Sequence, residues 1–366
     1  MALIKDVYSR EFYHQFLAAA ATVLPSINKK EFLTKIFDKD FKNKEWKERM
    51  KHTTRVLHHY MPAEFSKAAL MLDRLVTVLR KENLKEYSIA FMFLPDYIET
   101  YGLEEPEHSI RALESVTQFI TCEFAVRPFI LRYMEPMMRQ MLLWAEHESH
   151  HVRRLSSEGA RPRLPWAMAI PALKKDPAAI LPILEKLKND PSESVRRSVA
   201  NNLNDIAKDN PEIVLQIARK WKGVSRETDA IIKHGSRTLL KAGHPDILDH
   251  YGLDSSNILV KNFKVLTPAI NTGDYLAFSF AVENAASESK TVRLEYAIYY
   301  NKANGQLSKK VFKISERVAE AGTKIQVAKK HSFKPITTRK FYPGKHKVSV
   351  IVNGEEKAIK PFLLQA

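Results

Sequence analysis

The sequence predicts a multidomain protein, an all-α helical-repeat solenoid followed by an all-β sandwich. Two Val-Arg-Arg triplets, at residues 152–154 and 195–197, lie 43 residues apart, an offset within the ~40–47 residue period of HEAT-type helical repeats. From about Asn257 onward, apolar residues recur with a period of two, which is typical of strands. We therefore predict a HEAT-like α-solenoid over residues 1–253 and an immunoglobulin-like β-sandwich over residues 254–366.

Residues 1–105 are expected to form several amphipathic helices. Ser9 can cap the first of them, and Asn28 stands at the start of another apolar run with helical spacing. The apolar stretch 91–101 contains Pro95. Because proline lacks an amide hydrogen and clashes with the preceding turn, we expect a helix to bend or end there.

The next part of the chain should fold as pairs of antiparallel helices. Pro136, Pro177 and Pro211 each stand where the first helix of a pair would begin. Residues 190–193, Asp-Pro-Ser-Glu, have the composition of a capping box with the aspartate as N-cap. Gly243 is placed to end the last helix. Each pair would bury its apolar face against its neighbours.

The C-terminal part should contain about seven short strands. Apolar residues alternate in the segments 276–282, 294–300 and 348–352. Asn304-Gly305 and Asn353-Gly354 are strong hairpin signals. This spacing predicts an immunoglobulin-like sandwich without the disulfide of antibody domains.

The charge of the chain points to a polyanionic partner. The formal net charge is +16, with a pI near 9.6. Residues 254–366 contain 19 Lys and Arg against 9 Asp and Glu, so the C-terminal part is the more basic per residue. The alternative is that the cations only keep the protein soluble.

Several functional classes are disfavoured by what the sequence lacks. Cys122 is the single cysteine, which excludes an internal disulfide and a cysteine-based zinc site. The histidines form no HExxH pattern, so we expect neither a metal nor another cofactor. No apolar run could span a membrane and no secretory signal is evident, which favours a cytoplasmic, bacterial-type monomer with no membrane partner.

A basic ridge is expected along the second helices of the repeats. In a helix over residues 191–208, Arg197 and Asn201 lie opposite the apolar side. The repeat before it places Arg154 and Glu158 at matching positions, and the repeat after it places Lys233 and Arg237 there. Solenoids commonly bind through such an aligned face, although a solvated polar face is the simpler alternative.

Three segments, 119–129, 151–166 and 194–211, resemble the AlkC branch of the AlkC/AlkD DNA alkylation-repair glycosylases. The resemblance covers roughly residues 1–253, and the sandwich is similar to an Ig-like extension found in some members. It implies hydrolysis of the N-glycosidic bond of cationic alkylated bases, chiefly 3-methyladenine and 3-methylcytosine. It also implies that duplex DNA containing the alkylated base lies across the concave helical face, with the lesion left in the duplex rather than extruded.

The chemistry of this reaction selects candidate catalytic residues. An N3-methylated base is already a cationic leaving group, and the deoxyribose becomes oxocarbenium-like as the bond breaks. Carboxylates and an aromatic face can stabilise that charge, and a carboxylate can position water. The matching segments supply Glu123, Glu158, Asp205 and Trp166. The structural alternatives are surface ion pairs for Glu158 and Asp205, a buried satisfied acid for Glu123, and a wedge between repeats for Trp166.

The cations of the ridge, the motifs and the strand ends are candidate phosphate contacts. Binding without chemistry, by a nucleic-acid clamp or a protein–protein scaffold, remains the alternative function. The DNA-binding candidates are Arg127, Arg153, Arg154, Arg161, Arg163, Arg196, Arg197, Asn201, Lys233, Arg237, Lys309, Lys310, Lys329 and Lys330.

Overall fold

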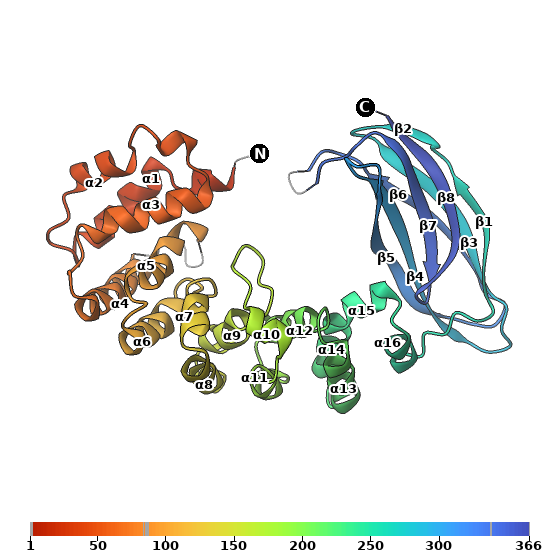
Figure 1. Cartoon of the computed structure of the whole chain (residues 1–366), viewed down its shortest axis with the longest axis horizontal. Coiled ribbons are helices and arrows are strands. Elements are labelled where there is room, and N and C mark those ends of the chain that lie inside the picture. The colour runs from red at the N-terminus through yellow and green to blue at the C-terminus, as the bar shows by residue number, and fades with distance from the viewer. Residues whose placement is uncertain (1–2, 83, 85–87, 337–338, 366) are drawn as a thin grey trace. The chain divides into compact units, whose positions relative to one another are not determined.

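The chain folds as two compact units, Met1–Gly235 and Ser236–Ala366 (Figure 1). The first unit is helical, and the described residues of the second form two short helices followed by eight strands. The predicted fold class, a helical-repeat region followed by an all-β domain, is confirmed. The computed structural model describes residues 3–82, 84, 88–336 and 339–365.

The helices of the first unit stack in chain order in two layers (Figure 1). Within one layer α3 contacts α5, α5 contacts α7, and α12 contacts both α9 and α14. The other layer, which includes α4, α6, α8, α11 and α13, packs against it. The α-helices of this unit are α1 (Arg10–Ala20), α2 (Lys29–Ile36), α3 (Trp46–His58), α4 (Phe65–Lys81), α5 (Phe93–Tyr101), α6 (Pro106–Thr117), α7 (Val126–Arg132), α8 (Met134–Trp144), α9 (His150–Gly159), α10 (Pro171–Lys175), α11 (Leu181–Leu187), α12 (Glu193–Ile206), α13 (Pro211–Trp221) and α14 (Arg226–Gly235). Short 3₁₀ turns η1 (Ile4–Val7), η2 (Phe41–Asn43) and η3 (Ile89–Met92) precede three of them.

Local capping chemistry explains where the first helices begin. The Ser9 hydroxyl accepts a hydrogen bond from the Phe12 amide at 3.1 Å, and the Asn28 side chain accepts one from the Glu31 amide at 3.0 Å. Both predicted caps are therefore confirmed. The expected break at Pro95 is wrong, because α5 begins at Phe93 and continues to Tyr101. Pro95 lies in the first turn, where an amide hydrogen has no partner within the helix.

Three predicted helix starts differ from the structure. The helix expected at Pro136, α8, begins two residues earlier, at Met134. The helix expected at Pro177 begins at Leu181, because Asp176 accepts a hydrogen bond from the Ala178 amide at 2.9 Å and forms a turn first. The N-cap of α12 is Ser192 rather than Asp190. The side chain of Asp190 is instead 3% exposed, and its carboxylate accepts a hydrogen bond from the Ser192 amide at 2.8 Å.

The second unit is a sandwich of two sheets. One sheet has the strand order β1-β3-β6, and the other has the order β2-β8-β7-β4-β5, in which β2 and β8 pair in parallel and the other neighbours are antiparallel. Apolar residues facing between the sheets, such as Phe278, Leu294 and Val350, are fully buried. The elements are α15 (Arg237–Ala242), α16 (Pro245–His250), β1 (Ile258–Val265), β2 (Ala269–Asn271), β3 (Tyr275–Asn284), β4 (Lys290–Asn301), β5 (Leu307–Ala319), β6 (Lys324–Ser332), β7 (Gly344–Val352) and β8 (Glu355–Gln365).

A glycine pair joins the short helices of this unit to its sheets. Gly243 ends α15 with a left-handed φ of 70°, but α15 is not the expected last helix, because α16 follows it. A Cβ built on Gly243 would lie 2.8 Å from the carbonyl oxygen of Gly354, and a Cβ on Gly354 would lie 2.6 Å from Leu248 of α16. Neither position has room for a side chain, so the two glycines allow α15 and α16 to pack closely against the β7–β8 turn.

Among the described residues, no helix combines the length and the apolar character needed to cross a bilayer.

Candidate active site

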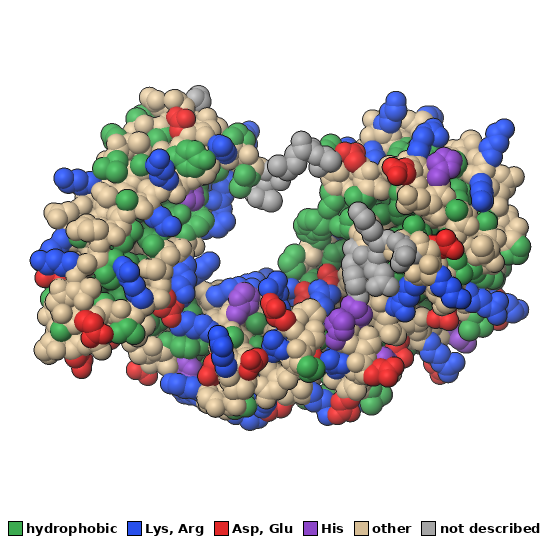
Figure 2. All heavy atoms as spheres, turned by 180° about the vertical axis from the view of Figure 1, so that it is seen from behind, with side chains coloured by type: hydrophobic (Ala, Val, Ile, Leu, Met, Phe, Trp, Pro, Cys, Tyr) green, Lys and Arg blue, Asp and Glu red, His purple; other side chains and the backbone are tan. Residues whose placement is uncertain are grey.

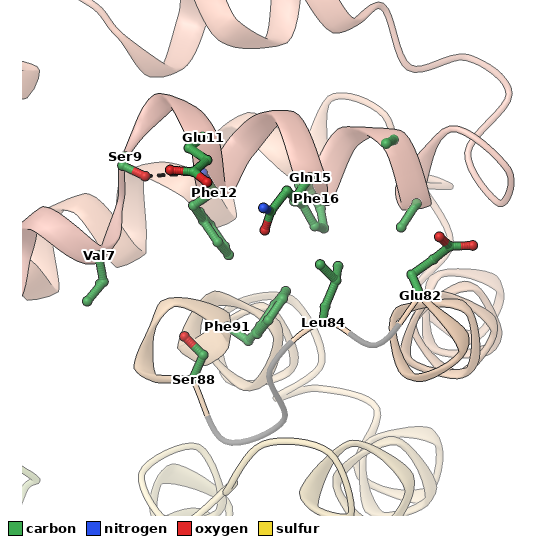
Figure 3. A pocket seen from close by; sticks show the side chains of 12 residues that line it. Val7, Ser9, Glu11, Phe12, Gln15, Phe16, Glu82, Leu84, Ser88 and Phe91 are labelled. Carbon is green, nitrogen blue, oxygen red and sulfur yellow. Dashed lines mark hydrogen bonds between the residues drawn. The ribbon is translucent and has the colours of Figure 1, made fainter.

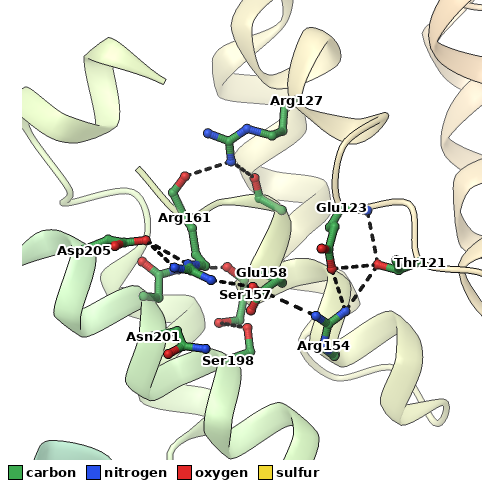
Figure 4. A network of polar contacts seen from close by, with 12 residues as sticks. Thr121, Glu123, Arg127, Arg154, Ser157, Glu158, Arg161, Ser198, Asn201 and Asp205 are labelled. Atoms are coloured by element: carbon green, nitrogen blue, oxygen red, sulfur yellow. Dashed lines mark hydrogen bonds and ion pairs between the residues drawn. The ribbon is translucent and has the colours of Figure 1, made fainter. Parts of the chain in front are cut away.

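Three acids from different parts of the helical unit meet around two arginines (Figure 4). Glu123 lies in the connection between α6 and α7, Glu158 lies in the last turn of α9, and Asp205 lies near the end of α12. The structure therefore brings together the three acids that the sequence singled out. Two neighbouring helices, α9 and α12, and the connection before α7 supply them, which is why residues so far apart along the chain can share a site.

Arg161 bridges two of these acids. Its Nη1 donates to Glu158 Oε1 at 2.6 Å, and its Nε donates to Asp205 Oδ2 at 2.8 Å. Lys208 reaches the other oxygen of Asp205 at 2.8 Å. The side chains of Glu158, Arg161 and Asp205 are 7%, 8% and 2% exposed, so these are charge-assisted hydrogen bonds with little access to water.

Arg154 holds the third acid. Its Nη1 lies 2.8 Å from Glu123 Oε2 and donates to the Thr121 hydroxyl at 3.2 Å. Its Nη2 lies 3.9 Å from Glu158 Oε1. Arg154 therefore connects Glu123 to the Glu158–Arg161 pair and is itself only partly buried, with 29% of its side chain exposed.

Buried polar contacts fix how α9 sits against α12. The Ser198 hydroxyl donates to the Ser157 hydroxyl at 3.0 Å, and Asn202 Nδ2 donates to the Ser157 carbonyl at 2.8 Å. These residues are at most 1% exposed. Because they lie beside Glu158 and Asp205 along the same helices, they set the position from which the acids project.

Burial and pairing shift the pKa values of two arginines in opposite directions. Burial raises the energy of the charged Arg127 side chain and, together with the nearby Arg161 charge, lowers the pKa of Arg127 to about 10. Burial would likewise lower the pKa of Arg161, but the carboxylates of Glu158 and Asp205 outweigh it and the pKa is raised. Both side chains are cationic at neutral pH.

Arg127 anchors the loop that follows α9. It is fully buried, and its guanidinium donates to the carbonyl oxygens of Gly159 and Arg161, each at 2.8 Å, and of Met168 at 2.7 Å. This placement differs from the expected phosphate contact. A guanidinium surrounded by main-chain carbonyls supports the loop and does not face solvent.

Other predicted phosphate contacts also have partners within the protein. Arg153 forms two hydrogen bonds with the buried Asp190 carboxylate, at 2.6 and 3.1 Å. Arg196 donates to the Asp190 carbonyl at 2.6 Å. Arg163 forms a bidentate pair with Asp209 at 2.9 and 2.6 Å. The pairs of Arg153 and Arg163 tie neighbouring repeats together, whatever else these arginines bind.

The remaining cations and Asn201 are more accessible. Arg197 is exposed and pairs with Glu193 of the same helix at 3.0 Å. Asn201 contacts His234 at 3.2 Å. In the sandwich, Lys309 lies 3.2 Å from Glu356. The half-buried members of this group are Asn201, Lys233, Arg237 and Lys329, and the exposed members are Arg197, Lys309, Lys310 and Lys330.

Trp166 is 61% exposed and lies in the loop between α9 and α10. Its ring centroid is 6.2 Å from that of Trp46, and the Lys47 ammonium donates to its carbonyl oxygen. The expected aromatic side chain is therefore presented to solvent from the same loop that supplies Arg161.

A cavity of about 680 Å³ opens between α9 and α12. Arg154 and Glu158 line one side of it, and Arg197, Ser198 and Asn201 line the other. A cavity of about 770 Å³ lies elsewhere, beside Phe12 and Phe91, and contains none of the predicted catalytic residues (Figure 3). The described residues include no group of three or more His, Cys, Asp or Glu that could hold a metal ion.

The contacts that hold the three acids and the loop after α9 in place were not predicted from the sequence. The bridging role of Arg161 and the anchoring role of Arg127 depend on contacts between distant segments, and no local pattern signals them. Lys47 carries no sequence signal that could have singled it out. Thr121 was the most accessible to prediction, since it lies two residues before Glu123 in a segment that carried the resemblance.

Comparisons with known proteins agree with this architecture. The family model described as the C-terminal Ig-like domain of uncharacterised protein YhaZ matches residues 259–366, and the HEAT repeat model matches residues 180–209. Uncharacterized protein YhaZ of Bacillus subtilis (strain 168) is 43% identical over 358 residues, which is 98% of each chain. The solved structure of the Pseudomonas fluorescens alkylpurine DNA glycosylase AlkC, bound to DNA containing an abasic site analog, is 32% identical. It superposes over 100% of both chains with a TM-score of 0.93. The chain therefore belongs to the AlkC family of HEAT-repeat proteins with a C-terminal Ig-like domain.

Proposed function

We propose that the chain is a DNA glycosylase that hydrolyses the N-glycosidic bond of cationic alkylated bases, 3-methyladenine and 3-methylcytosine, in duplex DNA. The observation that carries this proposal is the convergence of Glu123, Glu158 and Asp205 on Arg154 and Arg161. The full-length similarity to an alkylpurine DNA glycosylase bound to DNA supports it. Release of the damaged base would initiate base excision repair.

The carboxylates suit a reaction in which positive charge moves onto the sugar. A methylated cationic base leaves without prior protonation, so the protein needs to stabilise the oxocarbenium-like deoxyribose and to orient water. Glu158 lines the cavity between α9 and α12, where a deoxyribose could approach its carboxylate. The arginines hold the acids in place, which reduces the cost of reorganising them during the reaction.

DNA would be held across the layer of helices that presents this cavity, with the lesion remaining in the duplex. Figure 2 shows Lys and Arg side chains gathered over the middle of the helical unit, with Asp and Glu among them. Arg197 is exposed at the rim of the cavity and suits a phosphate contact. The lysines of the sandwich would add phosphate contacts that do not depend on sequence.

Release of free base from alkylated duplex DNA tests the proposal. Full-length protein in single-turnover excess should release 3-methyladenine or 3-methylcytosine, and should act far more slowly on a neutral lesion such as an O6-methylpurine. Comparable rates on a neutral lesion would require a general acid, a role that the proposal gives to none of the three carboxylates. Tight DNA binding with no base release would instead support the alternative of a non-catalytic scaffold.

A further inference from the structure

Trp166 has a backbone conformation that its own side chain disfavours. Its φ is 65°, in the left-handed region, where the Cβ of a non-glycine residue lies too close to the backbone. The other described non-glycine residues with a positive φ are three asparagines, a residue type that tolerates this region. A tryptophan therefore keeps this conformation only if the surrounding structure imposes it.

Two residues of α3 contact Trp166 in this conformation. The Lys47 ammonium donates to the Trp166 carbonyl oxygen across 119 residues of sequence. The ring of the neighbouring Trp46 is 5% exposed and packs near the Trp166 ring, at an interplanar angle of 47°. One end of α3 thus holds both the main chain and the side chain of Trp166.

The same lysine reaches the segment that carries Glu123. Lys47 Nζ lies 5.7 Å from the ring centroid of Phe124, over its face. Arg127 donates to the carbonyl oxygens of Arg161 and Met168 in the same loop. The loop is therefore held by two side chains, a buried arginine from α7 and an exposed lysine from α3.

We propose that Lys47 is a positioning residue, which fixes the exposed indole of Trp166 where the proposed reaction needs an aromatic face beside the sugar. The inference rests on the proposed glycosylase function, because only that reaction gives the contact between Lys47 and Trp166 a role in catalysis. It adds α3, which contains none of the three acids, to the elements that organise the site. Lys47 itself need not touch DNA.

The test compares three full-length variants. Lys47→Met removes the ammonium and keeps a long apolar side chain, and Lys47→Arg keeps a cationic donor. Lys51→Met is the matched control, because Lys51 is exposed one turn further along α3 and its loss changes the net charge equally. Thermal melts establish that all three fold.

Two readouts are needed, one with damaged DNA and one without DNA. The first is the single-turnover rate of 3-methyladenine release at saturating enzyme, alongside the Kd for undamaged duplex. The second is the ¹⁹F NMR spectrum of protein labelled with 5-fluorotryptophan, in which the resonance of Trp166 is assigned by its loss in Trp166→Phe.

Lys47→Met should lower the rate about 10- to 100-fold, the range expected for a small displacement of a reacting group. Its Kd should change no more than that of Lys51→Met, and Lys47→Arg should recover most of the rate. The Trp166 resonance should shift or broaden in Lys47→Met and stay in place in Lys51→Met. Equal rates in the two methionine variants, or an unchanged Trp166 resonance, would overturn the proposal. If the wild-type protein releases no base, the glycosylase function fails, while the NMR comparison still decides whether Lys47 positions Trp166.

Discussion

The guanidinium of Arg161 and the carboxylate of Asp205 meet across 44 residues of sequence, with Nε and Nη2 each 2.8 Å from the same Oδ2. This pair joins the loop after α9 to the end of α12. The contact that packs one repeat against the next is therefore also part of the proposed catalytic site. The first two predictions test its two roles, one in catalysis and one in stability.

Replacing Glu158 with glutamine should remove charge stabilisation while preserving size. We expect Glu158→Gln to lower the single-turnover rate of base release by at least ~10²-fold, in line with other losses of transition-state electrostatics. DNA affinity, measured by gel shift, should change little. Glu193→Gln is the control, because Glu193 lines the same cavity but is exposed and pairs with exposed Arg197. A near-normal rate in Glu158→Gln would move the catalytic role to Asp205 or Glu123.

Replacing Arg161 with methionine should destabilise the helical unit. The change leaves the buried carboxylates of Glu158 and Asp205 without their shared cation, a loss that typically costs about 3–5 kcal/mol. Arg163→Met also breaks an arginine–carboxylate pair in the same loop, but that pair is partly exposed and should contribute about 0–1 kcal/mol. Urea unfolding followed by circular dichroism measures both. If the two variants lose similar free energies of unfolding, burial does not make the Arg161 ion pairs more important for stability than the exposed Arg163 pair.

The sandwich should lose stability in mild acid because of His331. Burial, with smaller effects from Arg339 and Lys310, lowers the pKa of His331 to about 4. The neutral ring bridges the hydroxyls of Tyr296 and Tyr300 at 2.9 and 2.8 Å. The unfolded chain binds a proton near pH 6.5 while the folded chain does not, so the stabilisation is complete above that pH and is lost as the pH falls towards 4.

The non-titrating variant His331→Gln isolates this contribution. Glutamine can donate to one hydroxyl and accept from the other, so the bridge is retained. The unfolding free energy of the wild type should fall relative to that of the variant by up to roughly 3 kcal/mol between about pH 7.5 and pH 4. Parallel pH profiles for the two proteins would argue that His331 is protonated without penalty in the folded sandwich.

Phosphate contacts from the sandwich should be visible in the salt dependence of DNA binding. We expect replacement of Lys309, Lys310, Lys329 and Lys330 by glutamine to weaken binding to damaged and undamaged duplex alike. The slope of log K against log salt should become shallower by about 0.9 for each phosphate that is no longer neutralised. A control removes Lys261 and Lys324, which pair with Glu283 of the sandwich at 2.9 and 3.8 Å. Identical slopes in the two variants would show that the four lysines are not a specific DNA clamp.

Features set by nearby residues were predictable from the sequence. Ser9 and Asn28 cap helices as expected, and Asn353 and Gly354 adopt the left-handed conformations of a tight hairpin. Such features depend on hydrogen bonds and sterics within a few residues. The error at Asp190 shows the limit, because its carboxylate was available to cap α12 but pairs with Arg153 of the previous repeat.

In the proposed site, too, the residues with a local sequence signal were predictable, and the contacts between distant segments were not. Glu123, Glu158 and Asp205 could be named from short segments that resemble a family, and the structure places them together. The groups that orient them could not be assigned their contacts, because Arg161 and Arg127 look like any surface arginine in a basic chain. Whether a cation faces a phosphate or a buried carboxylate depends on tertiary packing, which charge patterning along the sequence does not encode.

The close approach of Gly243 and Gly354 has a practical meaning for chimaeras. A fusion that joined a sandwich from another protein after Leu253 would leave α15 and α16 facing a foreign β7–β8 turn. If that turn carried any side chain where Gly354 stands, it would collide with Gly243 and Leu248. If the two helices are exchanged together with the strands, from Ser236 onward, Gly243 and Gly354 come from the same protein and their close contact is preserved.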